Sequence, residues 1–300
     1  MTLPPPALDA LRDAFGERLL LGEPLARYTS ARIGGPADAF LAAHTPADLS
    51  TAARIAWMYD CPLFVLGGGS NVLISDAGVR GLVIHNRASK VTIRGSQVVA
   101  EAGANTIQLA RRLAKRGLSG FEWAIGVPGT LGGALYGNAG AHDGDMSRCT
   151  VRVDAATPEG EISYTSAEMG FEYRSSILKR ERRRCVILRA VLQFTPGDPA
   201  QIAARMEAFN AHRRRTQPPG ATVGSMFKNP PGDYAGRLID AAGLKGTQVG
   251  GAVISTVHAN FFLNLGGATA ADVMALINLA RERVRAQFGV ELELEIELRS

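Results

Sequence analysis

Two glycine-rich stretches of the 300-residue chain have the composition of loops that bind a phosphate or a flat ligand. The first, at residues 67–71, reads Gly-Gly-Gly-Ser-Asn and directly follows an apolar run at residues 62–66. Successive residues without side chains leave backbone N–H groups open to an anion. Because no Gly-Lys-Ser/Thr follows, and the third glycine of a Rossmann turn is missing, neither a P-loop nor a Rossmann site is indicated. The alternative is a plain turn between two strands.

The second stretch, at residues 117–140, holds eight glycines in 24 positions. Thr130 and Asn138 are its main polar side chains. A long glycine-dominated segment inside a domain is usually functional, and glycine lets the backbone come close to a ligand. We therefore expect this stretch to lie against an extended ligand, with close packing of backbone on backbone as the alternative.

Other polar residues could take part in acid, base or charge-binding chemistry, and each also has an ordinary structural interpretation. Arg174 follows a tyrosine at an expected strand end, where it could simply pair with a neighbouring acid. Ser225 follows a glycine and could be a turn residue that bonds its own backbone. Glu295 belongs to an alternation of glutamate and apolar residues over 291–298, which predicts a half-buried strand with an acidic face. His258 begins an apolar run, where a structural histidine is the alternative to a ligand contact.

The elements that must position these residues are mixed helices and strands. Thr45 and Asn105 are expected helix caps, and Gly117 and Gly289 are expected helix ends. The predicted helices cover residues 7–20, 46–60, 105–117, 198–215, 234–242 and 269–288. The predicted strands cover residues 62–66, 82–84, 91–93, 98–100, 151–155, 186–194 and 291–298. The linker at residues 195–197 is the best domain boundary, so the sequence predicts an α+β protein with more than one lobe.

Composition excludes several classes of protein. The three cysteines form no Cys-x-x-Cys pair, so neither a metal site nor a disulfide framework is indicated. The net charge is +5, but the basic residues are not interleaved with aromatic residues, so nucleic acid is not an expected partner. The basic run at residues 180–184 is expected to be a solvated loop, with a phosphate-steering patch as the alternative. Without a signal pattern or a long apolar stretch, we expect a cytoplasmic protein.

The two glycine stretches together resemble the flavin domain of the vanillyl-alcohol-oxidase type. Further motifs resemble the UDP-N-acetylenolpyruvoylglucosamine reductase family: Thr-Ser-Ala-Arg-Ile-Gly-Gly-Pro-Ala-Asp at residues 29–38, Tyr-Arg-Ser-Ser at 173–176, Gly-Ser-Met-Phe-Lys-Asn-Pro at 224–230, and the Ala-Gly-Leu-Lys-Gly, Gly-Gly-Ala and His-Ala-Asn-Phe segments within 242–261. The resemblance implies a two-lobed FAD-binding domain at residues 25–197, after an N-terminal segment at 1–24. A C-terminal αβ substrate-binding domain follows at residues 198–300.

The resemblance also implies a reaction, namely the NADPH-dependent reduction of UDP-N-acetylglucosamine enolpyruvate to UDP-N-acetylmuramate through noncovalent FAD, in peptidoglycan precursor synthesis. It makes Arg174, Ser225 and Glu295 catalytic, with Arg174 holding the substrate carboxylate and Ser225 donating a proton. Glu295 would share charge stabilisation with Arg174; Glu293 cannot replace it, because two residues along a strand move a side chain by about 6.6 Å.

The remaining assignments follow from the same resemblance. The residues assigned to FAD are Gly67, Gly68, Gly69, Ser70, Asn71, Gly126, Pro128, Gly129, Thr130, Gly133, Asn138 and Gly140. The residues assigned to the substrate are Tyr173, Lys228, Asn229 and His258. The length indicates the family's shorter form, and we expect a monomer without a metal. The alternatives are a flavin-dependent oxidase of the same superfamily and a nucleotide-binding regulatory protein without catalysis.

Overall fold

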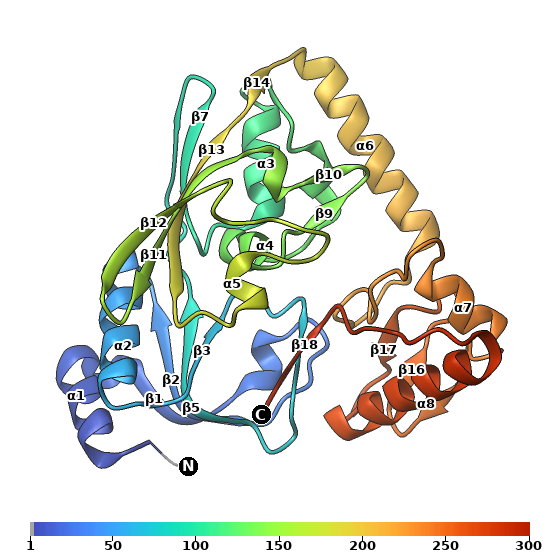
Figure 1. Cartoon of the computed structure of the whole chain (residues 1–300), viewed down its shortest axis with the longest axis horizontal. Helices are drawn as coiled ribbons and strands as arrows, with labels where there is room; N and C mark the ends of the chain where they lie inside the picture. Colours follow the sequence, from blue (N-terminus) through green and yellow to red (C-terminus); the bar gives the residue numbers. More distant parts are fainter. Residues whose placement is uncertain (1–2) are drawn as a thin grey trace. The chain divides into compact units, whose positions relative to one another are not determined.

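The computed structural model describes residues 3–300, and the chain divides into two compact units, each built from segments that are distant in sequence (Figure 1). The first unit contains the residues up to Leu21 together with Asp38–Gly68 and Arg80–His212. The second contains Gly22–Ala37, Gly69–Val79 and Arg213–Ser300. The chain therefore passes from the first unit to the second inside the Gly-Gly-Gly-Ser-Asn stretch, between Gly68 and Gly69.

A four-stranded sheet and two helices form one part of the fold. The strand order is β1 (Leu19–Pro24), β2 (Pro36–Ala43), β5 (Val79–Asn86) and β3 (Leu63–Leu66). The helices are α1 (Pro5–Phe15) and α2 (Pro46–Met58). Apolar side chains of both helices are buried with those of β2 and β5, including Leu11, Leu49 and Leu82. The parallel pairing of β3 with β5 fixes the end of β3, from which the first glycine stretch leaves.

A five-stranded antiparallel sheet is the larger core of the first unit. Its order is β12 (Gly160–Thr165), β11 (Thr150–Thr157), β13 (Val186–Gln193), β7 (Gln97–Glu101) and β6 (Val91–Arg94). One face packs on α3 (Thr106–Ala114) and α4 (Leu131–Tyr136). The unit also contains β8 (Leu118–Ser119), β9 (Gly140–Ala141), β10 (Gly144–Asp145), α5 (Ile177–Arg180) and β14 (Thr195–Pro196).

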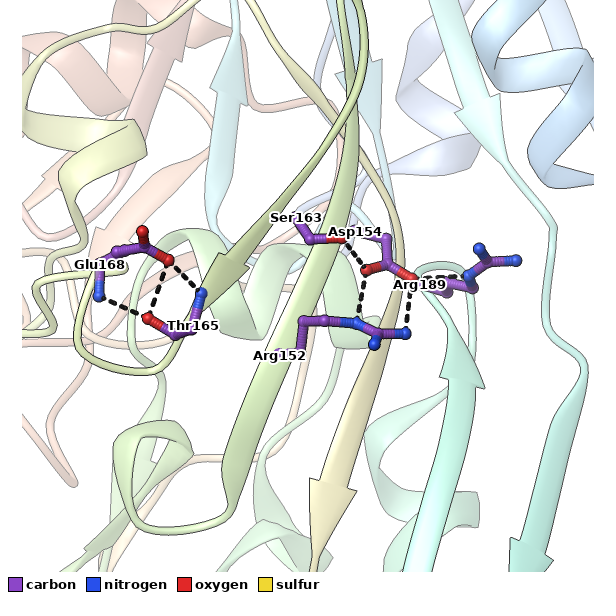
Figure 2. Close-up of polar contacts among 6 residues, drawn as sticks. All are labelled: Arg152, Asp154, Ser163, Thr165, Glu168 and Arg189. Atoms are coloured by element: carbon purple, nitrogen blue, oxygen red, sulfur yellow. Dashed lines mark hydrogen bonds and ion pairs between the residues drawn. The ribbon is translucent and has the colours of Figure 1, made fainter.

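Figure 2 shows a buried carboxylate that ties three strands of this sheet together. Asp154 on β11 accepts hydrogen bonds from Arg189 Nε at 2.8 Å, Ser163 Oγ at 2.8 Å and Arg152 Nε at 2.8 Å. Burial alone would raise the pKa of Asp154, but these hydrogen bonds outweigh burial and lower its pKa. Reciprocal bonds between Thr165 and Glu168 then close the end of β12 (Figure 2). These bonds fix the start of the segment that connects β12 to Arg174.

The second unit packs two helices on a small antiparallel sheet. Its elements are β4 (Val72–Ile74), α7 (Ala235–Ala241), β15 (Gln248–Val249), β16 (Ala252–Ile254), β17 (Phe262–Asn264), α8 (Ala270–Phe288) and β18 (Glu297–Arg299). Helix α6 (Pro199–Thr216) begins in the first unit and ends in the second. Strand β18 pairs in parallel with β4, so the last strand of the chain joins the segment that follows the first glycine stretch.

Most predicted elements agree with the structure, and two differ. Thr45 and Asn105 cap α2 and α3 by accepting hydrogen bonds from backbone N–H groups. The helix predicted over 7–20 ends at Phe15, because Gly16 adopts φ 57°, and a strand follows. The strand predicted over 291–298 is wrong for most of its length. Only Glu297–Arg299 is a strand, since the preceding residues make scattered backbone contacts instead of one ladder.

Candidate active site

The structure brings the two glycine stretches together within the first unit. A Cβ atom at Gly67 would overlap the hydroxyl of Thr130, and a Cβ at Gly68 would lie 3.0 Å from Gly129 Cα. Only residues without side chains allow this approach. By contrast, a Cβ at Gly133 would make only an ordinary van der Waals contact, with Thr130 Oγ1 at 3.7 Å.

The second stretch is fixed by the start of α3. Thr106 Oγ1 donates a hydrogen bond of 2.6 Å to the carbonyl of Val127, and Thr106 N donates to the carbonyl of Gly129 at 3.2 Å. Asn105 forms an isolated β-bridge with Thr130. The predicted cap of α3 therefore also sets the position of Thr130. Gly140 differs from the other glycines, since it pairs with Asp145 in the β9–β10 hairpin, where a Cβ would lie 2.5 Å from a carbonyl oxygen.

Arg174 lies at the tip of a tight turn in the first unit. Glu172 and Ser175 exchange backbone hydrogen bonds of 3.0 and 3.1 Å across this turn. Arg174 adopts φ 55°, a left-handed conformation that costs energy for a residue with a side chain. The Arg174 guanidinium carbon lies 5.2 Å from the ring centre of Tyr173, which is 55% exposed. The turn thus presents the arginine together with a tyrosine ring.

Ser225 lies on an extended segment of the second unit. It forms an isolated bridge with Phe261, and the neighbouring Met226 N donates to the carbonyl of Asn260 at 2.8 Å. The side chain of Asn260, 3% exposed, accepts from Phe227 N at 2.9 Å and donates to Phe227 O at 2.8 Å. An amide that pairs with both groups of one residue replaces a strand neighbour.

Glu295 is attached to the same segment through its backbone. Glu295 N donates to the carbonyl of Met226 at 3.0 Å, and Asn71 Nδ2 donates to the carbonyl of Glu295 at 3.2 Å. The residue is therefore held between the segment of Ser225 and the first glycine stretch. The side chain of Glu293, two residues earlier, is 72% exposed and forms an ion pair with Lys228.

The residues predicted to bind the substrate also have partners within the protein. Lys228 Nζ contacts Glu293 Oε1, and Asn229 Oδ1 accepts from Ala235 N at 3.1 Å, at the start of α7. His258 Nδ1 accepts from Asn260 N at 3.2 Å, so that nitrogen carries no proton. Burial, and then the charge of Lys245, lower the pKa of His258. The neutral ring can thus donate only from Nε2.

Among residues 3–300 there is no cluster of histidine, cysteine or acidic side chains that could hold a metal, and no helix there is long and apolar enough to span a membrane. All three cysteines are free thiols. Burial raises the pKa of Cys149 to about 12 and that of Cys185 to about 11, so neither is a thiolate near neutral pH.

The basic run at residues 180–184 has acidic and carbonyl partners. Arg180 donates to a backbone carbonyl, Arg183 pairs with Glu181 at 2.7 Å, and Arg184 pairs with Asp60 at 3.3 Å. Pairing of this kind favours the solvated loop over a patch that steers phosphate.

Comparison with known proteins assigns the chain to a family. Residues 216–299 match the family model described as UDP-N-acetylenolpyruvoylglucosamine reductase, C-terminal domain, and residues 37–166 match that of an FAD binding domain. The reductase of Rubrobacter xylanophilus is 46% identical over 91% of this chain and 93% of its own. That of Bacillus subtilis is 40% identical over 97% of each chain. The chain belongs to the UDP-N-acetylenolpyruvoylglucosamine reductase family.

A solved structure of this reductase family supports the same assignment. The reductase of Thermus caldophilus superposes with a TM-score of 0.80 at 35% identity, covering 94% of this chain and 98% of that one. The predicted α+β fold with an FAD-binding domain and a C-terminal domain is therefore confirmed. The match at residues 216–299 goes against the oxidase alternative, which required a different C-terminal domain.

One residue that sequence reasoning missed is Asn260, although its motif was part of the resemblance. Its side chain is buried and bonds to both backbone groups of Phe227. A polar residue within an apolar run was the available signal, because buried amides are nearly always hydrogen-bonded. The partner could not be predicted, since Asn260 and Phe227 are 33 positions apart.

Proposed function

We propose that this chain reduces UDP-N-acetylglucosamine enolpyruvate to UDP-N-acetylmuramate with NADPH, and so supplies a precursor of peptidoglycan. The observation that carries the proposal is the placement of Ser225 and Glu295 on neighbouring segments, joined by the hydrogen bond from Glu295 N to Met226 O at 3.0 Å. Reduction of an enol ether requires an acid that can protonate a carbon. It also requires a group, here a carboxylate, that stabilises the charge developing in the substrate. A cytoplasmic location and a monomeric state stay predictions.

FAD fits the two glycine stretches. Gly67 and Gly68 approach Gly129 and Thr130 so closely that side chains would obstruct the contact. Residues 67–71 would hold the diphosphate of FAD through backbone N–H groups. When bound, FAD supplies hydride chemistry, accepting hydride from NADPH and giving it to the double bond of the substrate. The protein supplies binding, orientation and exclusion of water.

Arg174 binds the carboxylate that lies beside the double bond of the substrate. A planar guanidinium can bind both oxygens of a carboxylate at once. The same contact stabilises the negative charge that develops on that side of the substrate during reduction. The neighbouring Tyr173 ring, 5.2 Å from the guanidinium carbon, restricts the directions that the arginine can adopt.

Ser225 donates a proton to the carbon next to the carboxylate. A serine hydroxyl is a very weak acid, so this role requires a strongly basic, carbanion-like carbon in a site that excludes water. Glu295 shares with Arg174 the stabilisation of the enolate-like charge distribution. Lys228 Nζ contacts Glu293 Oε1 in this structure.

The proposal is tested on the purified protein in two steps under anaerobic conditions. The protein should be yellow, NADPH should bleach its visible absorption, and the enolpyruvyl substrate should restore the absorption. A colourless protein that takes up no added FAD would overturn the whole proposal. A yellow protein that NADPH cannot reduce would instead favour the regulatory alternative. UDP-N-acetylglucosamine, which lacks the double bond, is the control that should not restore the absorption.

A further inference from the structure

Asn138, which the sequence assigns to FAD, has its side-chain amide occupied by the protein. The residue is 3% exposed. Its Oδ1 accepts a hydrogen bond from Ser147 N at 3.1 Å, and its Nδ2 donates to the carbonyl of Glu172 at 2.9 Å. The second Nδ2 hydrogen lies toward Asp145 Oδ2 at 3.5 Å. The bond from Ser147 fixes the orientation of the amide, so the donor side must face Glu172.

The partners of Asn138 and its neighbours lie on both sides of the turn that carries Arg174. Glu172, on the near side, receives the bond from Asn138. On the far side, the hydroxyl of Ser176, which is fully buried, donates to the carbonyl of Tyr136 at 2.7 Å. Residues 136–138 therefore hold the turn at residues 172–175 from both flanks.

The turn needs such support because Arg174 adopts the left-handed conformation, with φ 55°. A non-glycine residue keeps this conformation only where the surroundings hold it. The two backbone hydrogen bonds between Glu172 and Ser175 close the turn, but they do not attach it to the rest of the unit. The contacts of Asn138 and Ser176 attach it to residues 136–138, in addition to an ion pair between Glu172 and Arg180 at 3.4 Å.

We propose that Asn138 is a positioning residue for Arg174 and acts through the carbonyl of Glu172. This inference rests on the proposed role of Arg174 in binding the carboxylate of the substrate. A reaction that depends on the position of a charged group is slowed by small displacements of that group. The loss of the Asn138 bond should therefore affect the step in which the substrate is reduced, while flavin binding and reduction by NADPH are retained.

Asn138→Asp keeps the acceptor for Ser147 N, tolerates positive φ and replaces the donor to Glu172 by an acceptor, which also faces Asp145 Oδ2. Its reoxidation by the enolpyruvyl substrate should slow by about 10- to 100-fold. Reduction by NADPH and the dissociation constant for FAD should each change by less than about threefold. Asn86→Asp replaces another buried asparagine of the same unit and should leave the ratio of the two half-reaction rates unchanged.

A double-mutant cycle with Arg174→Lys decides whether Asn138 acts through the arginine. If it does, Asn138→Asp should slow reoxidation much less in the Arg174→Lys background than in the unaltered protein. Equal effects in both backgrounds, or a main effect on FAD affinity, would overturn the inference. Asn138 would then be assigned to FAD binding, as the sequence predicted. If Arg174→Lys itself leaves reoxidation unchanged, the proposed role of Arg174 fails, which is a separate outcome.

Ser176→Ala keeps the inference testable if the aspartate variant does not fold. The substitution removes only the hydroxyl that bonds to Tyr136 O, at a fully buried position where alanine fits. Reoxidation should slow in the same direction by at least about threefold, with flavin affinity unchanged. Unchanged reoxidation in a folded Ser176→Ala protein would show that residues 136–138 do not hold the turn in a way that matters for Arg174.

Discussion

The turn that carries Arg174 and the extended segment that carries Ser225 are held in two different ways. The turn has a left-handed residue at its tip and is attached to residues 136–138 by two side chains, those of Asn138 and Ser176. The segment of Ser225 instead has backbone contacts on two sides. Met226 bonds to Asn260 through its N–H and to Glu295 through its carbonyl.

This difference predicts which substitutions each region can tolerate. Backbone hydrogen bonds persist when a side chain is replaced, whereas a turn held by side chains loses its attachment when one of them is removed. Substitutions at Ser225 or Glu295 should therefore report on chemistry with little change of geometry. Substitutions around Arg174 should change both.

Ser225→Ala should give the largest effect on the reaction. The bridge between residue 225 and Phe261 involves backbone groups only, so alanine should keep the segment in place. The rate of reoxidation by the enolpyruvyl substrate should then fall by about 10⁴-fold, the upper end of the range for general acid catalysis, because Ser225 is the proposed proton donor in a site that excludes water. Reduction by NADPH should be nearly unchanged. Rapid mixing of each half-reaction measures the two rates separately.

Ser225→Cys is the companion to this prediction, since a thiol is a stronger acid at a similar position and should recover part of the rate. Equal losses in both half-reactions would mean that the substitution disturbs the site as a whole. If the rate of reoxidation falls only a few-fold, Ser225 acts as a turn residue and not as the proton donor.

Glu295→Gln should slow reoxidation by about 10²-fold, because it removes a charge from the developing enolate but keeps the side-chain volume. The bonds to Met226 and from Asn71 use the backbone of residue 295, so the position should be retained. Glu293→Gln is the matched control, since that side chain is exposed and pairs with Lys228. The control should change the rate by less than about threefold. Similar losses in both variants would contradict a special role for Glu295.

The sequence predicts features that depend on local contacts, but not those that depend on contacts between distant residues. Thr45 and Asn105 were predicted as caps because a cap bonds to backbone three residues away. The glycine stretches were identified by composition. The strand over 291–298 was predicted from alternation alone, but the partners of Glu295 are Met226 and Asn71, which no local pattern reveals. Glu172, which accepts the hydrogen bond from Asn138 Nδ2 at 2.9 Å, is likewise 34 residues away.

Asn260→Asp should slow reoxidation by only about threefold to tenfold, less than Asn138→Asp. The aspartate can still accept from Phe227 N but cannot donate to Phe227 O. The backbone bonds on either side, from Met226 N to Asn260 O and from Lys228 N to Glu293 O, both at 2.8 Å, keep the segment attached. Stability should fall by about 1–3 kcal/mol, because the carbonyl of Phe227 is left unpaired. Chemical denaturation measures the stability and rapid mixing measures the rate of reoxidation. A greater loss of rate than in Asn138→Asp would contradict the proposed difference between the two regions.

The smallest expected effect concerns the stability of the first unit and leaves the chemistry unchanged. His85 lies on β5 opposite Leu66, at the end of the strand from which the first glycine stretch leaves. Burial, and then the charges of Arg87 and His44, lower its pKa from 6.5 to about 4. The unfolded chain therefore binds a proton before the folded chain does. Between pH 6.5 and about 4 the free energy of unfolding should decrease as pH falls, and above pH 6.5 this contribution should be complete.

Both tryptophans of the chain, Trp57 and Trp123, lie in the first unit, so their fluorescence follows its unfolding. His85→Gln should remove part of the pH dependence measured this way. The change in slope should be less than about 1 kcal/mol per pH unit, because the ring is partly exposed and water screens its charge. His258→Gln is the comparison in the second unit, where the lowered pKa has the same sign but the reporting tryptophans are absent. If His85→Gln leaves the slope unchanged while His258→Gln removes it, the two units unfold together and the pH dependence originates in the second.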